Sequence, residues 1–212
     1  MTKSSGILNV GYFICRIVES PDFLGFDTDR FISVSDCLTD HEPQPSLCHG
    51  WKPRGDDKDY ISRFADIETY IRMSEEMNEL LEKRLFLVDG CFLRKEDAIH
   101  FYKEYFDSPD NILVSVMTEE YYRSYLGEDF ANCSSTSADT EGEFLGYDII
   151  GRDDWVFHSF LCNSLQKELP DVRFNSFGLI ANPFDEVKRM AAAIDGKGEP
   201  VDWLPAEIRR VL

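Results

Sequence analysis

Basic residues are scarce in this chain. It carries 22 lysines and arginines against 40 aspartates and glutamates, which gives a formal net charge of −18 over 212 residues. Proteins that bind nucleic acids draw most of their non-specific affinity from lysine and arginine contacts with phosphates, so this charge balance argues against a nucleic-acid partner. An acidic surface instead attracts a basic partner, or it simply keeps the protein dissolved.

Long apolar runs are also missing. No stretch approaches the ~18 consecutive apolar residues that a membrane-spanning helix needs. The uncharged run at 4–15 is interrupted by Asn9 and Gly11 and has no small-residue cleavage site after it, so we expect no export signal. Apolar residues nevertheless make up 43% of the chain, which excludes a disordered protein and allows a sizeable core. We therefore expect a cytoplasmic protein without membrane contact.

The cysteines form no compact framework. The six lie at positions 15, 37, 48, 91, 133 and 162, and no Cys-x-x-Cys pair occurs among them. Cys15, Cys91 and Cys162 fall inside apolar segments, where a free thiol packs as a small hydrophobic group. This distribution predicts reduced thiols in the cytoplasm.

Several motifs of common enzymes are absent. The chain has no phosphate-binding Gly-rich loop, no dinucleotide fingerprint, no nucleophile elbow and no His-Glu-x-x-His helix. A reactive cysteine needs a basic neighbourhood, and only Cys91, three residues before Arg94, has one nearby. These absences exclude the common NTPases, dinucleotide enzymes, serine hydrolases and zinc peptidases. Less stereotyped enzymes stay open, and no cofactor is predicted.

The hydrophobic pattern predicts one compact α+β (or α/β) domain over residues 1–212. Its main signals are apolar, β-branched runs for strands, one long amphipathic helix and an Asp89-Gly90 hairpin turn. Two β-α-β units predict parallel pairings, so we expect a mixed sheet packed by helices. The strands are expected at 7–18, 31–38, 112–117, 147–150 and 174–180, and the helices at 60–85, 98–106, 155–169, 184–194 and 205–212.

The stretch at 146–165 is the expected centre of the fold. It predicts a strand at Tyr147–Ile150, a tight turn at Gly151–Asp154 and a helix at about 155–169. Apolar side chains cover most of the circumference of that helix. A surface helix needs an apolar face of little more than about 100°, so we expect this one to be buried.

Two segments are predicted to be loops. Residues 39–59 form a long Pro/Gly-rich loop, and loops of that length in compact domains are often functional. Residues 128–143 contain five acidic residues and few apolar ones, which predicts a flexible acidic loop or a linker between sub-domains.

The turn before the predicted central helix holds the first candidate site: Asp148, Arg152, Asp153, Asp154 and His158. Asp154 and His158 are four residues apart and would share a helix face. A carboxylate beside an imidazole can orient a general base or help to hold a metal ion, as in a small hydrolase. In the structural alternative, an aspartate caps the helix, Arg152 pairs with an acid, and His158 is a partly buried residue with one satisfied nitrogen.

Two weaker candidates are zinc sites. His158 and Cys162 are four residues apart, a spacing that can supply two ligands from one helix. A second group of possible ligands lies within thirteen residues around the proline-rich loop, namely Cys37, His41, Cys48 and His49. Their spacing matches no familiar zinc pattern, so ordinary core and loop placement is the competing account.

Strong acidity and missing enzyme motifs favour a binding or inhibitory protein that engages a basic protein partner. Immunity proteins that neutralise nucleic-acid-degrading toxins are often acidic and bind basic partners. The similarity to them is one of charge and not of sequence. The residues expected to meet the partner are Glu128, Asp129, Asp139, Glu141, Glu143 and Trp51. The alternatives are a small hydrolase built on the 151–158 corner and an assembly protein that forms homo-oligomers through exposed aromatic residues.

Overall fold

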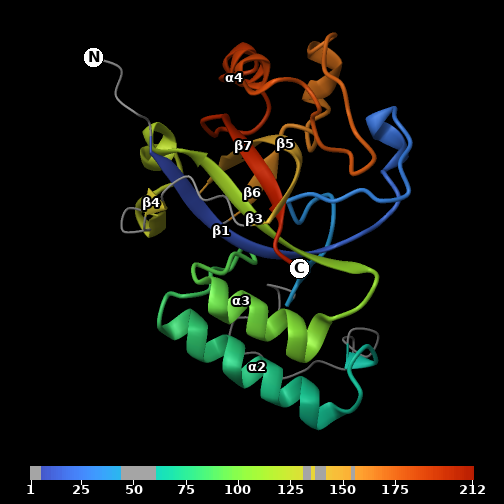
Figure 1. Ribbon diagram of the computed structural model, residues 1–212, viewed down its shortest axis with the longest axis vertical. Coiled ribbons are helices and arrows are strands. Elements are labelled where there is room, and N and C mark those ends of the chain that lie inside the picture. Colours follow the sequence, from blue (N-terminus) through green and yellow to red (C-terminus); the bar gives the residue numbers. More distant parts are fainter. Residues whose placement is uncertain (1–5, 44–60, 131–134, 137–141, 154–155) are drawn as a thin grey trace.

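The chain is organised by one antiparallel β-sheet (Figure 1). The computed structural model describes residues 6–43, 61–130, 135–136, 142–153 and 156–212. Across the sheet the strand order is β2-β1-β3-β7-β5-β6, and β4 pairs with β1 beside this path. The strands are β1 (Ile7–Arg16), β2 (His41–Glu42), β3 (Asn111–Glu119), β4 (Ser135–Thr136), β5 (Glu143–Arg152), β6 (Phe157–Ser159) and β7 (Leu204–Arg210).

Among the described residues, three α-helices and several short turns of helix accompany the sheet. None of the described helices is long and apolar enough to cross a membrane. The α-helices are α2 (Ile67–Glu82), α3 (Lys95–Phe101) and α4 (Phe184–Ala193). The short turns are η1 (Asp22–Leu24), η4 (Tyr102–Phe106), η5 (Glu120–Tyr125), η6 (Glu128–Phe130) and η7 (Leu165–Glu168).

All strand pairings among the described residues are antiparallel. The α+β class is therefore confirmed, but the predicted mixed sheet with parallel β-α-β units is wrong. The longest ladder joins β1 and β3, from Ile7 opposite Glu119 to Arg16 opposite Asn111. An apolar run indicates a buried strand in either kind of sheet, so the local pattern did not reveal the direction of pairing.

The predicted helix at 205–212 is also wrong, because this segment forms β7, between β3 and β5 near the middle of the sheet. Leu204, Ala206 and Ile208 are buried at every second position, which is the period of a strand. Pro205 looked like the first residue of a helix, but it is the second residue of β7. Its carbonyl accepts a hydrogen bond from the Thr118 hydroxyl at 2.7 Å. Proline is tolerated near the start of a strand, where ladder hydrogen bonds are still few.

The predicted central helix at 155–169 is wrong, because its described part, residues 156–169, contains no α-helix. Instead, β5 continues to Arg152, and β6 returns antiparallel to it, with Gly151 opposite His158. After β6 the chain makes tight turns, including Ser164 in the left-handed region at φ 55°, before η7. The segment is apolar all round because it is buried, and a short apolar run does not distinguish a buried strand from a buried helix.

The sheet curls, so that one core lies inside it and two lie outside. Phe13 of β1 and Phe157 of β6 meet edge to face with ring centroids 5.4 Å apart, although they belong to strands far apart in the sheet order. Helices α2 and α3 cover the outer side of β1 and β3, where Ile14 and Leu113 are buried. On the opposite side of the molecule, α4 packs against Ile149 of β5 (Figure 1).

Predictions of single elements succeeded where the residues of one short segment are enough to indicate its structure. The long amphipathic helix is α2, and Asp66 caps it by accepting the Thr69 N–H at 2.7 Å. The Asp89-Gly90 turn is present, with Gly90 at φ 84°. The predicted strands at 31–38 and 174–180 are reduced to isolated bridges. Within the predicted acidic loop, Phe130 is fully buried and β4 pairs with β1.

Candidate functional site

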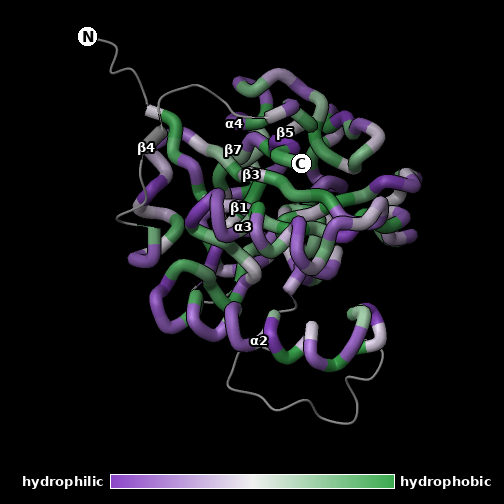
Figure 2. Tube along the Cα trace, turned by 60° about the horizontal axis from the view of Figure 1, so that its bottom comes forward, coloured by the Kyte–Doolittle hydropathy of each residue, from purple (hydrophilic) through white to green (hydrophobic). Residues whose placement is uncertain are grey.

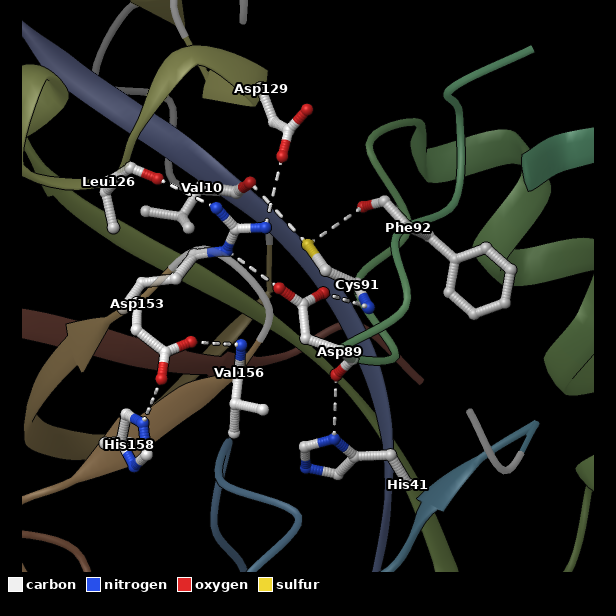
Figure 3. Close-up of polar contacts among 11 residues, drawn as sticks. Val10, His41, Asp89, Cys91, Phe92, Leu126, Asp129, Asp153, Val156 and His158 are labelled. Carbon is white, nitrogen blue, oxygen red and sulfur yellow. Dashed lines mark hydrogen bonds and ion pairs between the residues drawn. The ribbon is translucent and has the colours of Figure 1, made fainter. Parts of the chain in front are cut away.

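The β5–β6 hairpin contains the predicted Asp/His site at residues 148–158. It places Asp153 beside His158 but directs Arg152 into a separate ion cluster. The carboxylate beside His158 is that of Asp153, whose Oδ2 lies 3.2 Å from Nε2 of the imidazole (Figure 3). The second carboxylate oxygen of Asp153 accepts the Val156 N–H at 2.8 Å and so fixes the turn between the strands. Asp154, the expected partner of His158, lies outside the described residues.

His158 is 8% exposed, and its two ring nitrogens differ in their surroundings. Nε2 faces Asp153, whereas Nδ1 is buried with no hydrogen-bond partner. A buried polar atom without a partner costs free energy, so an orphaned nitrogen needs an explanation. The expectation of one satisfied nitrogen describes this histidine correctly.

Arg152 points away from this pair and forms a buried ion cluster. Its guanidinium donates to Asp89 at 2.8 Å, to the Leu126 carbonyl at 3.1 Å and to Asp129 at 3.2 Å. Burial lowers the pKa of Arg152, but the Asp89 and Asp129 carboxylates outweigh this and raise it overall. The cluster joins the end of β5 to the Asp89-Gly90 turn and to η6, so its role is to hold these segments together. The expected pairing of Arg152 with an acid is confirmed.

Asp148 is a buried carboxyl group and is 3% exposed. Its Oδ1 accepts hydrogen bonds from the Ser159 hydroxyl at 2.9 Å and from the Ile149 N–H at 2.8 Å. Burial raises the pKa of Asp148 to about 7, and these two hydrogen bonds oppose that shift. A carboxyl group with such a pKa could transfer protons, but it reaches a substrate only if the surrounding residues open. The hydrolase hypothesis stays a prediction.

Two cavities lined by described residues lie away from this corner. One is bordered by Arg16, Arg63 and Tyr105. A second lies beside Met117 and Phe184. These cavities therefore lend the hydrolase hypothesis no support at the 151–158 corner.

The two predicted zinc groups are rearranged by the fold. His41 is 1% exposed and places its ring nitrogens 3.0 Å from the Ser33 carbonyl and 3.3 Å from the Asp89 carbonyl. It is thus a core residue, while Cys48 and His49 lie outside the described residues. Cys37, in contrast, lies beside the other predicted pair. One ligand atom each from Cys37, His158 and Cys162 falls within 4.8 Å of the other two.

Spacing along the chain suggested two of the three residues of this cluster, but on a helix that does not form. His158 and Cys162 were expected on one helix, but they lie on β6 and in the turn after it. Burial raises the pKa of the Cys162 thiol to about 11. No local signal links Cys37 to this pair, because the contact arises only from the tertiary fold.

Of the expected partner-binding residues, the structure describes Glu128, Asp129 and Glu143. Asp129 is engaged with Arg152, and Glu143 forms an ion pair with Arg210 at 3.1 Å. Glu128 is exposed. Asp139, Glu141 and Trp51 lie outside the described residues.

A more regular acidic surface lies on α2. Its outward side carries four exposed glutamates: Glu68, Glu75, Glu79 and Glu82. A spacing of seven residues is close to two helical turns, so Glu68, Glu75 and Glu82 lie in one row. Ile67 and Ile71, which are 48% and 45% exposed, lie beside this row. The same side also carries exposed Arg72, whose guanidinium pairs with Glu104 at 2.8 Å.

No family model, no curated protein and no solved structure matches the chain. Its class is that of an acidic α+β protein with a curled antiparallel sheet, and its function has to be inferred from its own residues.

Proposed function

We propose that this protein is an acidic binding module that engages a basic protein partner through the outer side of α2. The observation that carries the proposal is the row of exposed glutamates on this helix with two exposed isoleucines beside it. In Figure 2 the trace of α2 is coloured mainly hydrophilic, with shorter hydrophobic stretches. Among the described residues, only Glu79 of the four forms an ion pair, with Lys83 at 3.1 Å. The other three glutamates are therefore available to a partner.

Charge and apolar contact would have separate roles in such a complex. The net charge of −18 attracts a basic protein over long range and raises the association rate, an effect that salt weakens. Ile67 and Ile71 supply apolar area at the contact itself, where burial contributes about 25 cal/mol per Å². An inhibitor of the immunity type would act by covering a basic surface of its target. The proposal retains the expected cytoplasmic setting.

The test uses a synthetic amphipathic peptide with lysines seven residues apart and leucines on the adjoining face. Isotope-labelled protein is titrated with this peptide, and backbone NMR shifts locate the contact. We expect shifts concentrated on α2, binding that weakens as salt is raised, and weaker binding to the triple variant E68Q/E75Q/E82Q.

The matched control variant is D29N/D171N/D195N. It also removes three negative charges, so the formal net charge changes from −18 to −15 as in the α2 variant. The three substituted residues are exposed and lie away from α2. The control should bind the peptide as the wild type does. Equal weakening by both triple variants would mean that net charge alone drives binding, and the α2 proposal would then be wrong.

The assembly alternative has its own observation. Tyr121 on η5 is 69% exposed and lies in a ring cluster with Tyr122 and Tyr125, at centroid distances of 5.1 and 6.0 Å. Exposed aromatic rings of this kind favour contact with another surface. Size-exclusion chromatography of the wild type and of Y121S tests this alternative, which requires an oligomer that the substitution weakens.

A further inference from the structure

Two thiols and one imidazole meet beside the β5–β6 hairpin. Cys37 is exposed, Cys162 is partly buried and His158 is buried, and one ligand atom from each lies within 4.8 Å of the others. Tetrahedral zinc, with Zn–S of about 2.3 Å and Zn–N of about 2.0 Å, needs ligand atoms roughly 3.5–3.8 Å apart. Closing the cluster onto an ion would therefore require movements of about 1 Å, and the exposed Cys37 side chain can make most of that movement.

The tautomer of His158 is suited to a metal ion. The Asp153 carboxylate can only accept a hydrogen bond when ionised, so its 3.2 Å contact requires the proton on Nε2. Nδ1 then holds a lone pair, and this atom is buried without a partner. Metal-bound histidines typically donate their other N–H to a carboxylate in this way, which fixes the ring and makes it a better ligand.

The surroundings of Cys162 also suit a bound thiolate. Its thiol donates to the Ser35 hydroxyl at 3.1 Å, and Ser35 is fully buried. When the thiol proton is displaced, the same hydroxyl can reverse its role and donate to the sulfur. The described cysteines, including Cys37 and Cys162, are free thiols.

We propose that Cys37, His158 and Cys162 bind one divalent zinc-type ion, with Asp153 as the residue that positions His158. Two thiolates and a neutral imidazole are ligands that select zinc over magnesium or calcium, which prefer oxygen. Their combined charge of about −2 balances that of the ion. Three protein ligands leave one tetrahedral position for water. This site is separate from the α2 surface and does not depend on the proposed function.

The experiment titrates reduced, metal-free, full-length protein with Co²⁺, which reports thiolate ligands through a sulfur-to-cobalt charge-transfer band. We expect one equivalent to bind with this band, and Zn²⁺ to displace it. C37S, C162S and H158Q should each weaken binding more than about tenfold, with the charge-transfer band reduced in the two cysteine variants. D153N should weaken binding about 10–100-fold while keeping the stoichiometry and the band.

A control variant and a folding check allow the test to separate metal binding from loss of structure. H100Q removes an exposed histidine whose Nε2 contacts Glu76 at 2.8 Å, and it should bind cobalt as the wild type does. C37S changes an exposed residue, so its circular dichroism and thermal midpoint should match the metal-free wild type even if C162S fails to fold. The proposal is overturned if the wild type shows no charge-transfer band, or if C37S and C162S retain the wild-type band and affinity.

Discussion

Replacement of Arg152 by methionine would leave the Asp89 carboxylate buried without its counter-ion. The two side chains are 3% and 1% exposed, and they are joined by a 2.8 Å hydrogen bond. Methionine is flexible and apolar, so it can fill much of the space between Phe130 and Phe157, over which the guanidinium now lies. The main effect of the change is therefore electrostatic.

The expected loss is large compared with the stability of a domain. Removal of one partner from a buried ion pair costs about 3–5 kcal/mol, against a total unfolding free energy of about 5–15 kcal/mol. For a chain of this size, 1 kcal/mol corresponds to roughly 2–4 °C in Tm, so R152M should melt about 6–20 °C below the wild type. Asp129 adds less to this loss because its side chain is 34% exposed.

Urea unfolding and thermal melts measure this loss, and a second substitution tests its cause. In the double variant R152M/D89N, the asparagine can still accept the Cys91 N–H, as Asp89 does at 3.3 Å, but it carries no charge. The double variant should therefore be more stable than R152M alone. R189M, on the exposed side of α4, is the matched control and should lie within about 0.5 kcal/mol of the wild type. If R152M costs less than about 1 kcal/mol, or if the double variant is less stable than R152M, the electrostatic explanation is refuted.

Two further predictions concern buried positions. Because burial raises the pKa of Asp148 from 3.8 to about 7, its ionisation opposes folding, and stability should fall by up to about 4 kcal/mol as pH rises from about 4 through 7. D148N should flatten this dependence in urea titrations with a metal chelator present, and an unchanged slope would assign the pH dependence to other groups. Gly178 and Gly196 both have φ 72°, but an added Cβ meets Phe31 at 2.3 Å at Gly178 and open space at Gly196. G178A should therefore lose about 1–3 kcal/mol more than G196A in the same assay, and equal losses would contradict the packing argument.

Local patterns in the chain determined those elements whose formation depends on neighbouring residues. Helices α2 and α4 were predicted because apolar side chains recur at helical spacing along one side of each. A hairpin turn at Asp89-Gly90 was predicted from this residue pair, which favours a type I′ turn with positive φ at both residues; the turn is present, but only Gly90 of the two has positive φ. The kind of partner that Arg152 takes was also predicted, since it was expected to pair with an acid.

Only the tertiary structure decided which distant segments meet. Nothing local selects Asp89 as the partner of Arg152, 63 residues away, and nothing local places Ser35 against Cys162, 127 residues away. The same limit explains two errors. The last strand was predicted to be a helix, and the 155–169 segment was predicted to be a buried helix. An apolar run shows that a segment will be buried, whereas its conformation and partners depend on the surfaces that cover it. For this reason the Cys37–His158–Cys162 cluster appears only in the folded chain.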